Sequence, residues 1–332
     1  MRGIDKSESP VLAVDLGGTK VVTAIVSRKG QVMAREYYPT LADEGPGSVI
    51  NRIHAAIDRL LWANGVNVSE LHSISVACAG AIDMSQGLVT SSPNLPGWCA
   101  IPFRDIMREK YGVNTYLIND AKAAALGECS FGAGRGVNNL VYLTVSTGIG
   151  GGIIIDGKLY FGSSGSAGEV GHMTIDVNGP KCNCGNIGCW ETLASGTAVA
   201  REARRRISGG ERSSLTETVE GRIEDITAEK VGAAAQLGDS LALDIIGKAA
   251  TYLGVGMVNL VNIFNPDMII VGGGMAKVGD LLLNPAKQIV RGRAFLVSAQ
   301  AVRIVLAQLG DYAGVLGAAV FALQQPLRKD VR

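Results

Sequence analysis

A strand, a glycine-rich turn and a second strand occur twice in this chain, and this repeated unit limits the fold more than any other feature. The first copy reads VLAVD, LGGTK and VVTAIVS over residues 11–27, and the second reads LVYLTVS, TGIGGG and IIIDGKLYFG over residues 140–162. β-Branched residues occupy the strand positions of both copies. Two copies are a weak repeat signal, but they predict two halves that open on the same plan.

Helical patterns alternate with buried strands around these two copies. The sequence predicts helices over residues 49–63, 101–112, 121–128, 192–207, 239–264 and 309–325, and strands over 73–80, 115–120 and 268–274. Asn265 and Pro266 should end the longest helix. The polar and charged stretch over residues 208–225 is the expected mobile insertion. The alternation of strands and helices predicts an α/β fold.

Length and charge exclude several classes of protein. A chain of 332 residues suggests two domains. The balance of 31 basic against 30 acidic residues gives no electrostatic support to a nucleic-acid or membrane-surface role. No uninterrupted apolar run reaches transmembrane length, and the stretch MRGIDKSESP has no apolar signal segment. Six cysteines in a chain of this length do not make a disulfide scaffold, so we expect a cytoplasmic protein.

Four metal-ligand side chains lie within eighteen positions of one another. The candidate ligands are His172, Cys182, Cys184 and Cys189. Three cysteines and one histidine are a standard set for structural zinc, and the two glycines between Cys184 and Cys189 would let the loop fold around an ion. The alternative is three unrelated cysteines, redox-active or not. A closed set of four ligands predicts a metal that organises a loop rather than one that performs chemistry.

Three glycine turns could bring backbone N–H groups onto a nucleotide. The first turn, DLGGTK, begins at Asp15. It is not the Walker pattern, and it lies between two strands rather than between a strand and a helix. The alternative is a plain hairpin turn without a ligand. Asp15 could hold a magnesium ion through water. The turn over residues 146–152 could clamp a triphosphate together with the first, and residues 271–274 could lie against a nucleoside. The predicted nucleotide contacts are Asp15, Gly17, Gly18, Thr19, Lys20, Thr147, Gly148, Gly273 and Gly274.

Asp120 follows Asn119 at the end of an apolar strand and precedes a predicted helix. A carboxylate at the carboxyl end of a strand is well placed for chemistry in an α/β fold, and as a general base it would accept a hydroxyl proton during phosphoryl transfer. The alternative is an N-cap for the helix that starts at Ala121, a frequent use of aspartate. The local sequence favours the cap.

Glu169 and His172 lie three positions apart, so they share a face if the segment is helical. Zinc on one ring nitrogen of His172 would leave the other nitrogen as an N–H donor for a substrate hydroxyl. Glu169 and Glu191 could then accept hydrogen bonds from neighbouring hydroxyls. A fixed donor beside two carboxylates suits a polyol such as a sugar, and the alternative is two surface carboxylates beside a structural metal.

These motifs, taken together, resemble those of the ROK family (repressors, open reading frames and sugar kinases). DLGGTK and STGIGGG are similar to the two phosphate motifs of the family, and EVGH followed by CNCGNIGCWE is similar to its signature with the zinc ligands. ASGTAVAREA, which follows directly, is most like the bacterial ATP-dependent glucokinase branch. The resemblance covers nearly the whole chain.

The resemblance implies an α/β, actin-like ATPase (ribonuclease H-like) fold with two similar domains around a cleft. It implies a small N-terminal domain over residues 1–119 and 312–332, which includes the C-terminal helix, and a larger domain over 120–311 with the zinc loop. It also implies that Asp120 is the catalytic base, against the local preference for a cap. The sugar-binding residues implied by the resemblance, with Gly80 as a plausible lining residue, are Gly80, Asn94, Asn119, Asp120, Glu169, His172 and Glu191.

The implied activity is transfer of the ATP γ-phosphoryl group to the 6-hydroxyl of glucose, with Mg²⁺, a structural Zn²⁺ and a homodimer. An N-acylhexosamine kinase, acting on N-acetylmannosamine or N-acetylglucosamine, is the alternative within kinases. The alternative of another class is a non-catalytic sugar-sensing regulator, which would be expected to lose Asp120 or a phosphate turn. Repressors of the family carry an N-terminal helix-turn-helix module, and with DLGGTK starting at Asp15 we expect none here.

Overall fold

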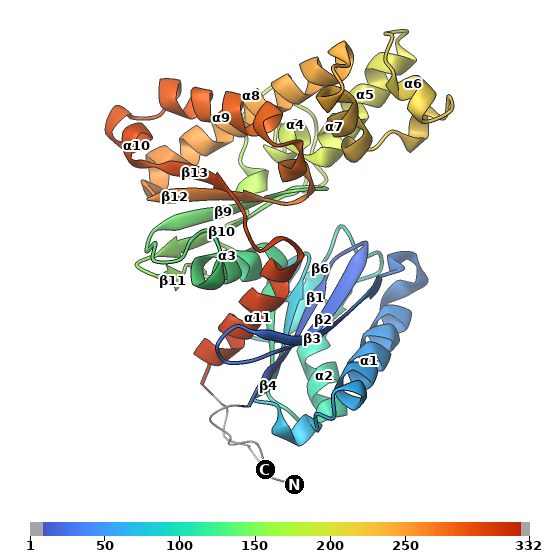
Figure 1. Ribbon diagram of the computed structural model, residues 1–332, viewed down its shortest axis with the longest axis vertical. Coiled ribbons are helices and arrows are strands. Elements are labelled where there is room, and N and C mark those ends of the chain that lie inside the picture. The colour runs from blue at the N-terminus through green and yellow to red at the C-terminus, as the bar shows by residue number, and fades with distance from the viewer. Residues whose placement is uncertain (1–8, 327–332) are drawn as a thin grey trace. The chain divides into compact units, whose positions relative to one another are not determined.

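The computed structural model describes residues 9–326 as two compact units (Figure 1). Within this range, unit 1 comprises residues 9–136, 152–167 and 308–326, and unit 2 comprises residues 137–151 and 168–307. The chain therefore passes from one unit to the other at four points.

Unit 1 is built on a five-stranded sheet in the order β3-β2-β1-β4-β8. Its strands are β1 (Val11–Leu16), β2 (Lys20–Val26), β3 (Val32–Pro39), β4 (Ser73–Cys78) and β8 (Thr115–Asn119). Strand β1 pairs with β2 in antiparallel and with β4 in parallel orientation, and β4 is parallel to β8. The first predicted strand–turn–strand copy thus forms the β1–β2 hairpin, and the turn DLGGTK lies at its tip.

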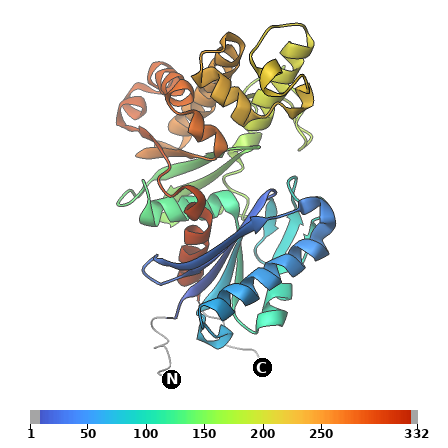
Figure 2. The ribbon, with the colours of Figure 1, turned by 45° about the vertical axis from the view of Figure 1, so that its right-hand side comes forward.

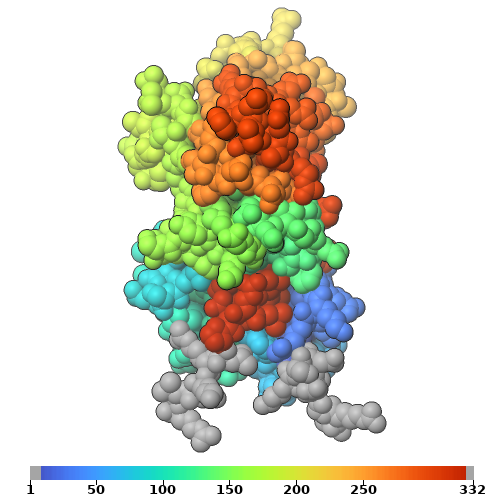
Figure 3. Space-filling view, turned by 90° about the vertical axis from the view of Figure 1, so that its left-hand side faces the viewer, coloured from blue at the N-terminus to red at the C-terminus, as the bar shows by residue number. Residues whose placement is uncertain are grey.

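Helices cover the sheet of unit 1 (Figure 2). Helices α1 (Gly45–Ala63) and α2 (Phe103–Tyr111) bury their apolar side chains against one face, together with strand residues such as Leu12 and Val14. Helix α11 (Ala313–Gln324) contacts β1, β2 and β4, and it packs against α3 (Asp120–Phe131). In Figure 3 the red residues of the C-terminal segment lie between blue and cyan segments of unit 1, far from them in sequence.

The expected division placed residues 120–136, 152–167 and 308–311 in the second domain, whereas all three segments belong to unit 1. For α3, in the first of these segments, the reason is its close packing against α11. A Cβ atom at Gly127 would lie 2.5 Å from the carbonyl oxygen of Ala313, and one at Gly317 would lie 1.6 Å from that of Ala123. Glycine at both positions lets the two helix backbones touch, so α3 is fixed to unit 1 by contacts that its own sequence does not show.

A small sheet in unit 1 supports the loop that contains Asn94. Its strands, in the order β5-β6-β7, are β5 (Ala81–Asp83), β6 (Leu88–Ser91) and β7 (Cys99–Ile101). Between β6 and β7, Leu95 and Trp98 are buried in the core of unit 1, and Trp98 packs edge-on against Phe103. The buried pair anchors this loop at both ends of a short segment, which fixes Asn94. Two 3₁₀ helices complete this part of the chain, η1 (Ala42–Glu44) and η2 (Val68–Glu70).

The second sheet has the order β11-β10-β9-β12-β13. Its strands are β9 (Leu140–Val145), β10 (Ile149–Ile155), β11 (Lys158–Leu159), β12 (Met268–Gly272) and β13 (Arg303–Leu306). When the strands of each sheet are numbered along the chain, both sheets have the order third, second, first, fourth, fifth. The prediction that the two halves share one plan is confirmed.

Most helices of unit 2 fall between β9 and β13. They are η3 (Val170–His172), α4 (Glu191–Ala194), α5 (Gly196–Ser208), α6 (Leu215–Thr218), η4 (Ile223–Asp225), α7 (Ala228–Gln236), α8 (Ser240–Phe264), η5 (Gly274–Val278), α9 (Asp280–Arg293) and α10 (Leu296–Ala301). The last 3₁₀ helix, η6 (Gly310–Tyr312), belongs to unit 1.

Two expectations about unit 2 need correction. Residues 192–207 form two helices rather than one, because Ser195 is extended (ψ 168°) and its hydroxyl accepts a hydrogen bond from the N–H of Ala198 as the N-cap of α5. The stretch expected to be a mobile insertion contains α6 and η4. It is held by Leu215 and Val219, both of which are buried.

Helix α8 is long and apolar enough to cross a membrane by length and composition alone, but it is a core helix of unit 2. Gly256 lies against the indole of Trp190, where a Cβ atom would be 2.0 Å from Trp190 Cε2. At Gly254 a Cβ atom would lie 2.6 Å from Cβ of Ile289. These glycines therefore serve close packing. The helix ends at Asn265, which adopts the left-handed conformation (φ 43°), at the predicted stop.

Candidate active site

The first glycine turn is closed by backbone hydrogen bonds and packs directly on the loop that contains Asn94. The N–H of Gly17 donates to the carbonyl oxygen of Lys20 (3.0 Å), and the hydroxyl of Thr40 donates to that of Gly17 (2.7 Å). A Cβ atom at Gly18 would lie 2.6 Å from the carbonyl oxygen of Asn94. Only glycine allows this approach, so a predicted phosphate turn and a predicted sugar residue are neighbours in unit 1.

Asp15, at the end of β1, has an unusual electrostatic setting. Burial, and to a smaller extent the nearby charges of Asp120 and Asp311, raise the pKa of its carboxyl group to about 7, against the lowering effect of Lys20. Lys20 itself forms an ion pair with Asp311. Asp15 thus lies close enough to two further carboxylates to feel their charge, and carboxylate oxygens are hard donors of the kind that a divalent cation prefers.

Asp311 was missed by the sequence analysis. It lies in η6, within the segment LGDYAG that precedes the final helix, and an acidic residue before a glycine-containing helix is a weak signal. Its ion pair connects the C-terminal segment to Lys20 of the first glycine turn.

Asn119, and not Asp120, caps helix α3. Asn119 is extended, and its side-chain oxygen accepts hydrogen bonds from the N–H groups of Ala121 (3.0 Å) and Lys122 (3.2 Å). Its amide donates to the carbonyl oxygen of Gly80 (3.1 Å). Asp120 is the first helical residue, and one carboxylate oxygen accepts from the N–H of Ala121 (2.8 Å). The capping role that the local sequence favoured for Asp120 therefore belongs to its neighbour.

The second and third glycine turns lie side by side in unit 2, because they follow the parallel neighbours β9 and β12. The N–H of Ser146 donates to the carbonyl oxygen of Gly148 (2.9 Å) and closes the second turn. Gly273 has φ 86°, and a Cβ atom there would lie 2.5 Å from the carbonyl oxygen of Val145. A Cβ atom at Gly274 would lie 3.6 Å from Ser146 Oγ. The two turns present their backbones at one edge of the sheet.

The start of helix α5 holds the second turn in place. The N–H of Gly196 donates to the carbonyl oxygen of Ser146 (2.7 Å), and the hydroxyl of Thr197 donates to that of Thr147 (2.7 Å). The sequence analysis did not single out Thr197 for this role, although it lies in the segment ASGTAVAREA. The hydrogen bonds explain why this segment and the turn belong together.

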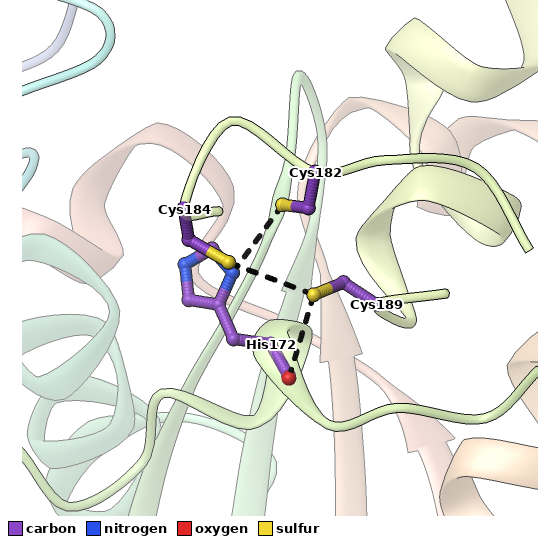
Figure 4. Close-up of side chains that lie close together, drawn as sticks. All are labelled: His172, Cys182, Cys184 and Cys189. Atoms are coloured by element: carbon purple, nitrogen blue, oxygen red, sulfur yellow. Dashed lines mark hydrogen bonds between the residues drawn. The ribbon is translucent and has the colours of Figure 1, made fainter. Parts of the chain in front are cut away.

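The predicted metal ligands form one cluster (Figure 4). The ligand atoms of His172, Cys182, Cys184 and Cys189 all lie within 4.8 Å of one another. Cys182 Sγ is 3.7 Å from His172 Nδ1, and Cys184 Sγ is 3.7 Å from Cys189 Sγ. Zinc–sulfur bonds of about 2.3 Å at tetrahedral angles place two sulfur atoms about 3.8 Å apart. The spacing therefore fits a tetrahedral ion.

The loop that contains the cysteines is shaped by its own backbone. The N–H of Cys182 donates to the carbonyl oxygen of Asn186 (2.8 Å), and Gly185 and Gly188 both have positive φ, 94° and 65°. Burial raises the pKa of the Cys182 and Cys189 thiols. Clustered thiols of raised pKa gain most from a cation that stabilises the thiolate form.

Glu191 lies between this cluster and the second glycine turn. Its Oε1 is 3.3 Å from Cys182 Sγ and 3.5 Å from His172 Nδ1, and its Oε2 accepts a long hydrogen bond from the N–H of Ile149 (3.5 Å). Glu169 is exposed and directly precedes η3. Glu169 lies outside the helix (ψ 48°), although the N–H of His172 donates to its carbonyl oxygen (3.2 Å).

Each unit thus brings together part of the predicted set. Unit 1 contains Asp15, Gly17, Gly18, Thr19, Lys20, Gly80, Asn94, Asn119 and Asp120. Unit 2 contains Thr147, Gly148, Glu169, His172, Cys182, Cys184, Cys189, Glu191, Gly273 and Gly274. In both units a glycine turn directly contacts a predicted sugar residue: Gly18 meets Asn94, and a Cβ atom at Gly148 would lie 2.6 Å from Glu191 Oε2.

Known proteins with this arrangement are numerous. A glucokinase from Halalkalibacterium halodurans is 36% identical over 315 residues, which cover 95% of each chain. A xylose repressor from Caldicellulosiruptor bescii is 32% identical over 330 residues, 98% of this chain and 80% of the repressor. A crystal structure of a ROK family glucokinase from Streptomyces griseus, in complex with glucose and AMPPNP, is 33% identical with a TM-score of 0.84, and the match covers 96% of this chain and 100% of that one.

The structural match confirms the α/β, actin-like fold that the sequence resemblance implied. The model of the ROK family matches residues 11–325, which span all three glycine turns, the cysteine cluster and the C-terminal helix. On this match, and on relatives more than 30% identical over nearly the whole chain, the protein belongs to the ROK family.

Proposed function

We propose that this protein is an ATP-dependent glucokinase, which transfers the γ-phosphoryl group of ATP to the 6-hydroxyl of glucose. The observation that carries the proposal is the match over 96% of the chain to a glucokinase solved with glucose and AMPPNP. The presence of a carboxylate free of the capping role, Asp120, supports it from the chemistry of the site.

In this proposal the sugar contacts are those that the family resemblance implies. Asn94, Asn119 and the backbone at Gly80 would bind hydroxyls on the unit 1 side, and the hydrogen bond between Asn119 and Gly80 keeps two of these groups in register. Glu169, His172 and Glu191 would bind the remaining hydroxyls. Carboxylate acceptors beside an imidazole donor match the alternating donors and acceptors of a polyol.

Asp120 would act as the general base. Its carboxylate accepts the proton of the 6-hydroxyl, the sugar oxygen attacks the γ-phosphorus, and the bond from that phosphorus to the β,γ-bridging oxygen breaks, which gives glucose 6-phosphate and ADP. Such a reaction needs placement and electrostatic stabilisation more than covalent help from the protein. The N–H groups of the first two glycine turns, with Thr19 and Lys20, would position the phosphates. Gly273 and Gly274 would lie against the nucleoside.

Asp15 would hold Mg²⁺ through water. Burial and the nearby charges of Asp120 and Asp311 raise the pKa of Asp15 to about 7, so a hard cation bound beside it would stabilise the ionised carboxylate. Bound Mg²⁺ would neutralise charge on the transferring phosphates.

His172, Cys182, Cys184 and Cys189 would hold a structural Zn²⁺. Since Nδ1 is the ring nitrogen of His172 that faces the sulfur atoms, Nε2 would carry the proton and donate to a sugar hydroxyl. The ion would therefore fix both the loop and the orientation of one sugar-binding group. Glu191 contacts the same cluster, so its position would depend on the metal too.

A substrate panel tests the proposal. Glucose, N-acetylglucosamine and N-acetylmannosamine would be compared in a coupled ADP-release assay, with ATP, GTP and polyphosphate as donors. We expect glucose with ATP to give the highest kcat/KM. A preference for an N-acylhexosamine would identify that sugar, rather than glucose, as the substrate. The absence of turnover with any sugar would favour a non-catalytic regulator, a hypothesis motivated by the similarity to the xylose repressor.

We also propose that the enzyme is cytoplasmic and forms a homodimer, as the family resemblance implies. Light scattering on the purified protein would test the dimer, with a mass twice that of one chain expected. A mass equal to one chain would refute it.

A further inference from the structure

Glu128, near the end of helix α3, is a fully buried charged residue that the proposed mechanism does not use. Its Oε1 accepts hydrogen bonds from the N–H groups of Gln308 (2.9 Å) and Leu309 (2.7 Å), and its Oε2 accepts one from the N–H of Ala133 (2.8 Å). None of the ion pairs found within residues 9–326 includes Glu128. Its charge is therefore stabilised by backbone N–H groups, each a charge-assisted hydrogen bond.

These N–H groups lie at two of the four points where the chain passes between the units. Ala133 precedes the first crossing, at residues 136–137, and Gln308 and Leu309 follow the last, at residues 307–308. Gln308 and Leu309 are about half the chain away from Glu128 in sequence. One carboxylate thus ties the departing and the returning chain to helix α3, wholly within unit 1.

The packing around the carboxylate leaves no spare room. A Cβ atom at Gly132 would lie 2.0 Å from Glu128 Oε2 and 3.0 Å from Cγ of Leu309. The backbone oxygen of Glu128 also accepts hydrogen bonds from the N–H groups of Gly132 (3.1 Å) and Gly134 (2.9 Å). Both the side chain and the backbone of this residue hold the segment that leads into unit 2.

The same elements connect to the proposed chemistry. Helix α3 begins with Asp120, the proposed base, so the base and Glu128 belong to one helix. The segment after Leu309 contains Asp311, which forms an ion pair with Lys20 of the first glycine turn. Glu128 is therefore linked to the proposed base on one side and to a proposed phosphate-binding residue on the other.

We propose that Glu128 is a positioning residue that couples sugar binding to nucleotide binding, because it fixes the chain at two crossings. The inference rests on the proposed function. Within unit 1, α3 begins with Asp120 and the segment after Leu309 pairs with Lys20, so the binding of one ligand can favour the binding of the other through Glu128 only if these two segments are held firmly. Coupling of this kind between two ligands is typically about 5–150-fold in affinity.

The sharpest test removes one hydrogen-bond donor of the backbone. Leu309→Pro deletes the N–H that donates to Glu128, and the φ of Leu309, −81°, is one that proline adopts. Leu309→Ala is the matched control, since it loses the side chain and keeps the N–H. Calorimetry would measure the Kd of glucose with and without AMPPNP. We expect the ratio of the two Kd values to fall towards one in Leu309→Pro and to stay at the wild-type value in Leu309→Ala.

Glu128→Gln is the stronger perturbation, because an amide has to direct its NH₂ group at one of the three N–H donors. We expect the same loss of coupling in Glu128→Gln. The Kd of glucose without AMPPNP should change less than about threefold, which is below the range of about 5–150-fold typical of coupling. A buried core substitution in unit 1, Phe103→Leu, controls for lost stability. Full coupling in both Glu128→Gln and Leu309→Pro would overturn the proposal and leave Glu128 a purely structural group.

Hydrogen exchange separates this inference from the proposed function. If the wild-type protein binds no glucose, the proposed function fails. Hydrogen exchange in the ligand-free protein still tests whether Glu128 holds the chain at the two crossings. We expect the amides of residues 133 and 308 to exchange slowly in the wild type and at least about tenfold faster in Glu128→Gln. Unchanged exchange at both amides would show that the carboxylate holds neither crossing.

Discussion

Replacement of Asp120 by asparagine should separate catalysis from stability, because the structure assigns these two roles to different residues. Asn119 caps α3 with hydrogen bonds of 3.0 and 3.2 Å, and asparagine at position 120 can still accept from the N–H of Ala121. The helix cap is then kept, and the lost charge at a helix N-terminus costs about 0.3–1 kcal/mol. A lost general base lowers kcat by about 10²–10⁴, which corresponds to about 3–5 kcal/mol.

The coupled ADP-release assay would measure kcat, calorimetry the Kd of glucose, and thermal unfolding the stability of Asp120→Asn. We expect the Kd of glucose to stay within about threefold of the wild type while kcat falls at least about a hundredfold. Asn119→Ala is the converse control, and it should lose about 0.5–2 kcal/mol of stability through the missing cap. The reasoning would be refuted if Asp120→Asn kept more than about a tenth of the wild-type kcat, or if it destabilised the protein as much as Asn119→Ala.

Three further predictions follow from the site. Elemental analysis should find one zinc ion per chain in the wild type and none in Cys184→Ser, and this variant should also have a lower Tm. Cys99 is an exposed cysteine of β7 outside the cluster, so Cys99→Ser should change neither the zinc content nor the Tm. Wild-type protein without zinc would contradict the prediction. In Mg²⁺-free protein, the pKa of Asp15 is about 7 in the folded state, against its usual 3.8. The folded state therefore binds the proton more tightly than the unfolded state does. The free energy of unfolding should fall by up to about 4 kcal/mol as pH rises from about 4 to 7. Asp15→Asn should lack that slope, and an equal slope in both proteins would rule out Asp15 as its source. Gly18→Ala places a methyl group 2.6 Å from the carbonyl oxygen of Asn94. It should raise the KM for glucose and cost about 1–3 kcal/mol of stability. A Cβ atom at Gly47 in α1 has nothing within 4 Å, so Gly47→Ala should change neither quantity.

Local patterns predicted the parts of this protein whose partners are close in sequence. The two strand–turn–strand copies, the four clustered ligands and the end of α8 at Asn265 all follow from signals within short segments. The ligands of the cluster are contributed by one stretch of the chain, so a short loop is enough to bring them together.

Other features depend on contacts that no short segment contains. Asn119 and Asp120 are both capping residues by type, and only the extended backbone of Asn119 decides between them. Ser195 lies in a run of helical spacing, and its role as a cap ends the expected helix early. Glu128 occurs in an alanine-rich helix without any local signal, since two of its hydrogen-bond donors are 180 and 181 residues away.

The buried tryptophans give each unit an optical probe of its own. Trp98 lies four residues after Asn94 in the core of unit 1, and Trp190 directly precedes Glu191 in unit 2, with its indole N–H donating to the carbonyl oxygen of Tyr252 (2.9 Å). Trp62, 86% exposed, is the third tryptophan and would contribute a solvent-relaxed background to the emission. After a Trp62→Phe substitution, the fluorescence of Trp98 and Trp190 could follow sugar binding in real time, without any attached dye.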